Sequence, residues 1–128
     1  MSYYFSTIVD CSFDEAVARV TEELQKEGFG ILSDINVQEA LKKKLGVDFK
    51  RYRILGACNP PFAYEALKLE EKIGTMLPCN VIVLEKEDGR IEISAVDPKA
   101  SMQAIVNPGL QDIAGEVQAK LKKVIAAL

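Results

Sequence analysis

The feature that most limits the possible folds is a pair of apolar segments joined by a short turn. Residues 80–84 form a largely apolar run, and residues 91–95 alternate between apolar and polar side chains. Between them lies Glu87-Asp88-Gly89, a segment typical of a hairpin turn. A wholly parallel sheet needs a crossover between each pair of strands, which a hairpin does not provide. The pattern therefore predicts antiparallel pairing here and disfavours a doubly wound parallel fold.

Two long helices are predicted, one near each end of the chain. Ser12 and Glu15 form a capping box that begins the first helix, and Gly28 is a suitable residue to end it. Asn107-Pro108 caps the second helix, where lysines near the C-terminal end suit the helix dipole. Each helix carries one apolar stripe at helical spacing, formed by Phe13, Val17, Val20 and Leu24 in the first and by Leu110, Ile113, Val117, Leu121, Val124 and Leu128 in the second.

The remaining elements complete an α+β pattern. We expect further strands at 3–9, 29–37 and 49–58, helices at 38–45 and 61–73, and a helical turn around 101–105. This order fits a mostly antiparallel sheet with the two long helices packed on one face. The 128 residues, of which 48% are hydrophobic, are expected to form a single domain over 1–128.

Charge and composition disfavour several classes of protein. The net charge is −3, whereas nucleic-acid-binding domains are usually basic, so no nucleic-acid partner is expected. The basic cluster of the chain is interpreted as a solvated surface, and it consists of Lys42, Lys43, Lys44, Lys50, Arg51 and Arg53. No apolar run is long enough to span a membrane, and the first residues do not form a secretory signal. Three cysteines, an odd number, favour reduced thiols and the cytoplasm.

The chain has no histidine, which limits the chemistry it can perform. Histidine is the commonest general base and a frequent metal ligand, so Ser-His and Cys-His arrangements are excluded. The glycines form neither a P-loop nor a dinucleotide-binding fingerprint. No catalytic residue is therefore predicted, the cofactor stays unknown, and the sequence leaves open whether the chain is an enzyme.

Two cysteines occupy positions where function is plausible. Cys58 comes at a strand end directly before a helix N-terminus, where the helix dipole favours a thiolate. Cys79 comes at the start of the expected central strand. If the two strand ends lie side by side, the thiols could act together in redox chemistry or hold a metal. The alternative is that both are small buried hydrophobic residues, as free cysteines usually are.

Neighbouring residues extend this candidate site. Asn59 and Asn80 could hydrogen-bond a ligand at the same edge of the sheet, although Asn59 also fits the N-cap position of a helix beginning at Pro60. Aromatic residues, together with Met76, could line a pocket with the two thiols at its mouth. The candidate ligand-binding residues are Tyr52, Cys58, Asn59, Tyr64, Cys79 and Asn80.

The segments around the two cysteines carry a family resemblance. Gly56-Ala57-Cys58-Asn59-Pro60, Ala63-Tyr64-Glu65-Ala66-Leu67 and Leu77-Pro78-Cys79-Asn80-Val81 resemble the bacterial and archaeal "domain of unknown function 302" family. The resemblance covers nearly the whole chain. It implies a TATA-binding-protein-like or helix-grip fold, in which an antiparallel sheet grips a long C-terminal helix. It supplies no established activity, substrate or catalytic residue.

Three functional hypotheses follow. The first is a binding module without catalysis, which holds a small apolar ligand between a curved sheet and a long helix. The second is a thiol-based redox or metal-handling protein that uses Cys58 and Cys79. The third is a structural partner protein, a homodimer formed through an apolar sheet face or an edge strand, which is compatible with either of the others.

Overall fold

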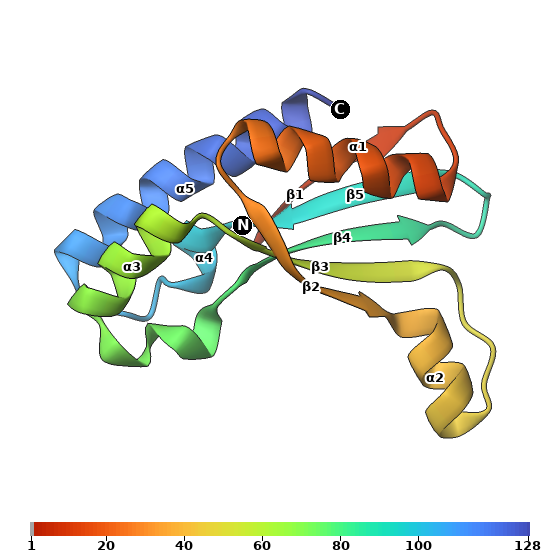
Figure 1. The fold of residues 1–128 in the computed structure, drawn as a ribbon, viewed down its shortest axis with the longest axis horizontal. Coiled ribbons are helices and arrows are strands. Elements are labelled where there is room, and N and C mark those ends of the chain that lie inside the picture. Colours follow the sequence, from red (N-terminus) through yellow and green to blue (C-terminus); the bar gives the residue numbers. More distant parts are fainter. Residues whose placement is uncertain (1) are drawn as a thin grey trace.

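A five-stranded antiparallel sheet forms the centre of the molecule (Figure 1). The computed structural model describes residues 2–128. The strands are β1 (Tyr4–Val9), β2 (Gly30–Asn36), β3 (Tyr52–Cys58), β4 (Cys79–Glu85) and β5 (Ile91–Val96). They lie in the order β1-β5-β4-β3-β2, and each neighbouring pair is antiparallel. The β4–β5 hairpin predicted from the sequence is confirmed.

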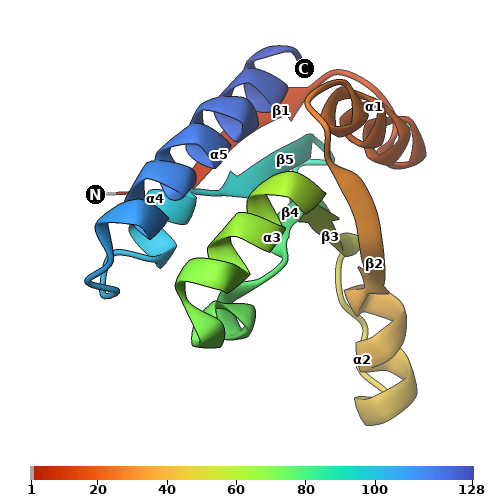
Figure 2. The same cartoon turned by 60° about the vertical axis from the view of Figure 1, so that its left-hand side comes forward.

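The helices pack mainly on one side of this sheet. They are α1 (Phe13–Lys26), α2 (Val37–Leu45), α3 (Pro60–Leu69), α4 (Pro98–Ser101) and α5 (Pro108–Ala126), with a 3₁₀ helix η1 (Glu71–Met76). Helices α1 and α5 contact each other and both contact β5, and α3 lies beside α5 (Figures 1 and 2). The predicted α+β fold, with two long helices on one face of an antiparallel sheet, is confirmed.

Local signals explain where α1 begins and ends. The Ser12 Oγ accepts a hydrogen bond from the Glu15 backbone N–H at 3.1 Å, so Ser12 caps the helix as predicted. The Glu15 carboxylate accepts from the Ser12 hydroxyl at 3.0 Å. Beyond the last turn, Gly28 has a φ of +87°, a backbone conformation that favours glycine. The buried side chains of α1 face the sheet, and they are Phe13, Ala16, Val20 and Leu24.

The apolar interior is divided into two clusters. The larger cluster lies between the sheet and the helices α1 and α5, with Val81, Ile93 and Leu121 fully buried at its centre. The smaller cluster lies beyond the sheet, between the first turns of α5 and the elements α3 and η1, and contains Ala66 and Ile73. Helix α5 contributes to both clusters and therefore connects the two parts of the core.

The opposite face of the sheet is left uncovered by α1, α3 and α5 (Figure 2). Because successive strand residues point to opposite faces, this open face carries Ile54 of β3, Ile82 of β4 and Ser94 of β5. Helix α2 projects from the end of β2, and none of its residues is buried (Figure 1). Asn36 caps α2 by accepting from the Glu39 N–H at 3.0 Å.

The helix predicted at 61–73 is wrong at its C-terminal end. Helix α3 stops at Leu69, Glu70 is extended with a φ of −144°, and a separate 3₁₀ helix follows. The Leu69 carbonyl accepts a hydrogen bond from the Asn107 Nδ2 at 3.0 Å, which satisfies the helix end. The break also lets Ile73 turn inward, where its side chain is fully buried.

Two other boundaries also differ from the prediction. The third strand begins at Tyr52 and not at residue 49, so Phe49 lies in the preceding loop and is 40% exposed. The helical turn expected around 101–105 is instead α4, at 98–101. The Asp97 side chain begins it by accepting from the Lys99 N–H at 3.0 Å.

Several residues of the basic cluster are held in ion pairs. Lys42 contacts Asp48 at 3.0 Å, Arg51 contacts Asp14 at 3.2 Å, and Arg53 contacts Asp34. These pairs reduce the positive charge that this surface presents. Within residues 2–128, no helix has both the length and the hydropathy needed to cross a membrane.

Candidate functional site

An apolar pocket of about 310 Å³ lies at the junction between the two core clusters. The ends of β3 and β4 form one side, and α3, α4 and α5 form the other. Of the side chains that the structure describes, none that lines it is charged, and only that of Asn59 is strongly polar. The lining residues are Phe29, Leu32, Ala57, Cys58, Asn59, Phe62, Ala63, Ala66, Leu67, Leu77, Pro78, Cys79, Pro98, Met102, Leu110, Ile113, Ala114 and Val117.

The lengths of the elements explain why a pocket forms here. Helix α5 has 19 residues and is about 28 Å long at 1.5 Å per residue. The strands have 6 or 7 residues, which gives about 20–23 Å at 3.3 Å per residue. The helix therefore extends past the sheet, and its first turns pack on α3 in the smaller cluster. The pocket lies where the sheet ends beneath this overhang.

A bulge in β2 helps to form the rim. The pairing of β2 with β3 shifts between Ile31 and Ser33, which leaves Leu32 outside the regular ladder. Leu32 lines the pocket yet is 70% exposed, and Leu67 of α3 lines it while 46% exposed. Both residues therefore lie where the pocket opens to solvent, and the rim itself is apolar.

Cys58 and Cys79 line this same pocket. In the ladder between β3 and β4, Cys79 pairs with Ala57, the residue before Cys58. Burial raises the pKa of the Cys79 thiol to about 11, and the nearby Cys58 adds to this rise. A thiol with such a raised pKa is a poor nucleophile at neutral pH because the thiolate is the reactive form.

The two thiols alone do not make a structural zinc site. Cys58 and Cys79 are free thiols, and together they supply only two sulfur ligands. Structural zinc sites use four ligands. In the part of the chain that the structure describes, no group of three or more His, Cys, Asp or Glu side chains could hold a metal ion.

Asn59 occupies the N-cap position of α3, but its side chain does not cap the helix. Pro60 and Pro61 have no N–H, so the first helical turn offers few donors to a cap. The Asn59 Nδ2 instead donates to the Glu27 carbonyl at 3.1 Å, at the end of α1. Asn59 as a whole is only 8% exposed, and it lines the pocket. The prediction that Asn59 occupies the N-cap position is confirmed. The prediction that its side chain caps α3 is wrong.

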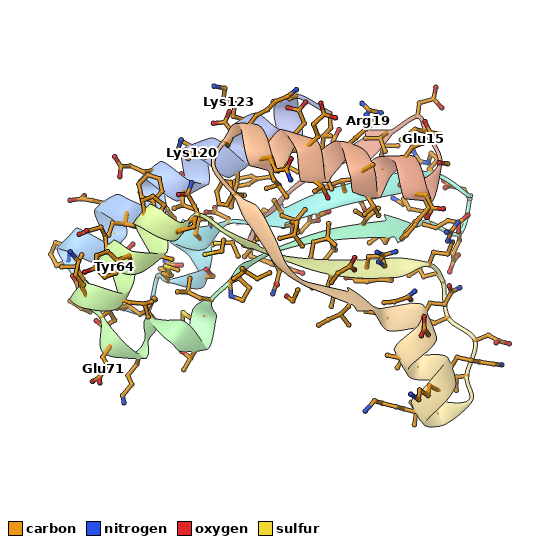
Figure 3. All side chains as sticks on the ribbon, in the orientation of Figure 1. Glu15, Arg19, Tyr64, Glu71, Lys120 and Lys123 are labelled. Carbon is orange, nitrogen blue, oxygen red and sulfur yellow. The ribbon has the colours of Figure 1, made fainter. Side chains whose placement is uncertain are left out.

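The other candidate residues lie elsewhere. Tyr52 and Asn80 line a second hollow of about 390 Å³ on the open face of the sheet. Tyr64 is 64% exposed on α3, where the Lys68 Nζ lies 4.5 Å from its ring centroid (Figure 3). Met76 is 39% exposed and lines neither hollow. The expected pocket formed by these residues together with the cysteines is therefore wrong.

The second hollow is more polar than the first. Its Ser94 hydroxyl donates to the Ser6 Oγ at 3.0 Å, and the Ser6 hydroxyl donates to the Glu92 carboxylate at 2.6 Å. Burial raises the pKa of Tyr52, and nearby Tyr3 and Glu92 raise it further. Glu92 is thus held by a hydrogen bond from Ser6, and the hollow lies on the open face of the sheet, bordered by tyrosines.

Sequence reasoning missed most of the pocket lining. The stripe of α5 was expected to pack as core, but its first members, Leu110, Ile113 and Val117, also line the pocket. A usable signal was the length of this stripe, which exceeds what a short strand can cover. Phe62 and Ala66, four residues apart on α3, face the pocket in the same way.

Comparisons with known proteins point to one family. The family model described as "Domain of unknown function DUF302" matches residues 5–128. The chain is also similar to the crystal structure of an uncharacterized conserved DUF302 protein from Bacillus stearothermophilus. That similarity has a TM-score of 0.91 and 29% sequence identity, and it covers 98% of each chain. Among the curated proteins, none matches the chain.

Proposed function

The chain belongs to the DUF302 family, and from this premise we propose that it is a binding module that takes a small apolar molecule into the pocket. The observation that carries the proposal is the lining of this pocket, which contains no charged side chain among residues 2–128. Its volume of about 310 Å³ is in the range of small-molecule sites. Apolar surface gains roughly 25 cal/mol per Å² when it is removed from water, which favours an apolar occupant.

Four alanines support a binding role for this space. Ala57, Ala63, Ala66 and Ala114 line the pocket from β3, α3 and α5. Larger side chains at these positions would occupy the space that a ligand needs. Because most of the lining residues belong to the two core clusters or pack against them, closing the pocket would disturb that packing.

A variant that fills the pocket tests the proposal. Naphthalene serves as a neutral apolar probe, and amide shifts in ¹H–¹⁵N spectra report where it binds. We expect saturable shifts around Ala63 and Ala114 in the wild type. The Ala66→Leu substitution should weaken binding at least about tenfold, since it places an isobutyl group in the pocket. Ala119→Leu is the matched control, because Ala119 is exposed on α5 and does not line the pocket. Absence of saturable shifts in the wild type would reject the binding function.

We also propose that two copies associate through the open face of the sheet. This face carries exposed Ile8 and Ile35 near its edges and Ile82 near its centre. Exposed apolar patches often mark interaction sites, and two-fold dimers are the commonest assemblies. Light scattering during size-exclusion chromatography should give the mass of a dimer for the wild type and of a monomer for Ile82→Lys. Val106→Lys is the control, because Val106 is 98% exposed in the loop before α5. A wild-type monomer at high micromolar concentration would refute this interface.

Thiol chemistry is the second candidate function. The proximity of Cys58 and Cys79 in one pocket favours it, whereas the raised pKa of Cys79 opposes it. A Cys58–Cys79 disulfide that forms readily in a glutathione redox buffer, seen by mass spectrometry, would place this function first.

The three free thiols also support our proposal that the protein acts in the cytoplasm.

A further inference from the structure

One polar atom in the apolar pocket lacks a partner. The Asn59 Nδ2 donates to the Glu27 carbonyl at 3.1 Å, but among residues 2–128 no group donates to the Asn59 Oδ1. The orientation of the amide is fixed by this contact, because a carbonyl can only accept a hydrogen bond. The Nδ2 therefore faces Glu27, and the Oδ1 remains a free acceptor on a residue that is only 8% exposed.

The free acceptor belongs to a residue that lines the pocket, and it is not sealed inside the protein. In the described part of the chain, each side-chain nitrogen or oxygen that is sealed from solvent has a hydrogen-bond partner. The Asn59 Oδ1 has none, so it is not sealed, and Asn59 is one of the residues that line the pocket. An acceptor that is mostly removed from water without a partner is unfavourable, and a donor brought in by a ligand would relieve this.

The amide is also held in place. Gly28 follows Glu27, and a Cβ on Gly28 would lie 3.1 Å from the Asn59 Nδ2, so the amide packs against the end of α1. The Glu27 carboxylate lies 3.5 Å from the Lys123 Nζ and 3.9 Å from the Lys120 Nζ, which ties this end to α5 (Figure 3). A fixed acceptor selects ligands better than a mobile one, because less ordering is required on binding.

The side chains that line the pocket indicate which charge a ligand can carry. Across the described chain, no lysine, arginine, aspartate or glutamate lines the pocket, so an ionised group would enter without a charged partner. Burial of an unpaired charge is strongly unfavourable. An uncharged hydroxyl or N–H group needs only one acceptor, and the Asn59 Oδ1 supplies it.

We propose that the pocket selects an uncharged molecule with an apolar body and one hydroxyl or N–H group that donates to the Asn59 Oδ1. This inference rests on the proposed binding function and adds the chemical class of the ligand. Neutral alcohols, phenols and N–H heteroaromatic compounds belong to this class. Carboxylates and ammonium ions do not.

A matched pair of probes tests the class. 1-Naphthol and 1-methylnaphthalene have the same shape, but only 1-naphthol can donate a hydrogen bond. The preference for 1-naphthol over 1-methylnaphthalene, measured as the ratio of their Kd values, should be larger in the wild type than in Asn59→Leu. We expect this ratio to differ about tenfold between the two proteins, which is the effect of one hydrogen bond. Ala119→Leu, on the exposed side of α5 and outside the pocket, should leave the ratio unchanged. 1-Naphthoate should bind at least about tenfold more weakly than 1-naphthol.

A second measurement needs no variant and covers the case in which Asn59→Leu does not fold. In wild-type protein, the ¹³Cγ resonance of Asn59 should move when 1-naphthol binds, because the Oδ1 then accepts a hydrogen bond. It should stay near its free position when 1-methylnaphthalene binds. If both probes bind and move this resonance equally, the donor inference fails and the binding function stands. If neither probe binds, the binding function itself fails.

Discussion

Gly28 and Asn59 are in contact across the junction between α1 and α3, where a Cβ on Gly28 would lie 3.1 Å from the Asn59 Nδ2. Gly28 has a φ of +87°, so it both turns the chain after α1 and leaves room for the amide. The preceding carbonyl, that of Glu27, is then available to the Asn59 Nδ2. The end of one helix thus positions the polar group of the pocket.

Replacement of Gly28 by alanine should destabilise the protein through two effects. The left-handed backbone costs about 1–2 kcal/mol for a residue with a Cβ, and the contact with Asn59 adds to this. Gly89→Ala is a matched control, since Gly89 has a φ of +85° and a Cβ there would meet nothing within 4 Å. Urea unfolding should show a larger loss of free energy for Gly28→Ala. Equal losses would mean that the contact with Asn59 contributes nothing.

The Gly56→Ala substitution should be more disruptive than an alanine elsewhere in the sheet. A Cβ at Gly56 would overlap the Ser33 Oγ and lie 2.7 Å from the Pro78 Cγ, so neighbouring segments would have to move. Overpacking of this kind costs about 1–3 kcal/mol. Gly30→Ala, also in the sheet but with nothing within 4 Å of the added Cβ, should change the free energy of unfolding little. A similar midpoint of thermal unfolding for both variants would contradict the expected clash.

Cys79 should make the protein less stable at high pH. Burial raises its pKa from 9.0 to about 11 in the folded protein, so folding favours the protonated thiol. This stabilisation is complete below pH 9 and is lost as the pH rises to about 11. The full loss is about 3 kcal/mol at 1.36 kcal/mol per pKa unit. Free energies of unfolding measured from pH 8 to 11 should fall more steeply for the wild type than for Cys79→Ala. Parallel slopes would show that the Cys79 thiol is not protected by burial.

The ion pair between Arg53 and Asp34 should stabilise the contact between β2 and β3. The hydrogen bond from Arg53 lowers the pKa of Asp34 below 3.8, so the stabilisation is present at neutral pH. It is lost as the pH falls through this lowered pKa. Since the Asp34 side chain is 38% exposed, Asp34→Asn should cost at most about 1 kcal/mol at pH 7. Thermal unfolding should show this difference at pH 7 and a smaller one as the pH falls through the lowered pKa of Asp34. A difference independent of pH would argue against the ion pair.

The sequence predicts helix starts well because their signals are local. Ser12, Asn36 and Asn107 each precede a helix, and each side chain accepts from an N–H of the first turn. The end of α3 could not be predicted in this way. Its Leu69 carbonyl is satisfied by Asn107, which lies 38 residues further along the chain. Such a contact exists only after the tertiary fold has formed.

The candidate site was predicted only in part. The strand register that places Cys79 opposite Ala57 brings the two cysteine segments to one pocket, and this depends on long-range pairing. The separation of Asn80 from Cys79 could have been foreseen, because adjacent strand residues point to opposite faces. The hydrogen bond between Asn59 and Glu27 has no sequence signal. Ligand binding by these residues, and a single domain over 1–128, stay predictions.

The exposed helix α2 has a consequence for how the chain can vary. Strands β2 and β3 are antiparallel neighbours, so a short turn would suffice to join them, yet the chain leaves the sheet to form α2. Within this excursion, the Gln38 Nε2 donates to the Phe49 carbonyl at 2.9 Å. Because none of the α2 side chains is buried, residues can be added or removed here without altering the core. The segment is therefore a natural place for length variation among relatives and for the insertion of a reporter sequence.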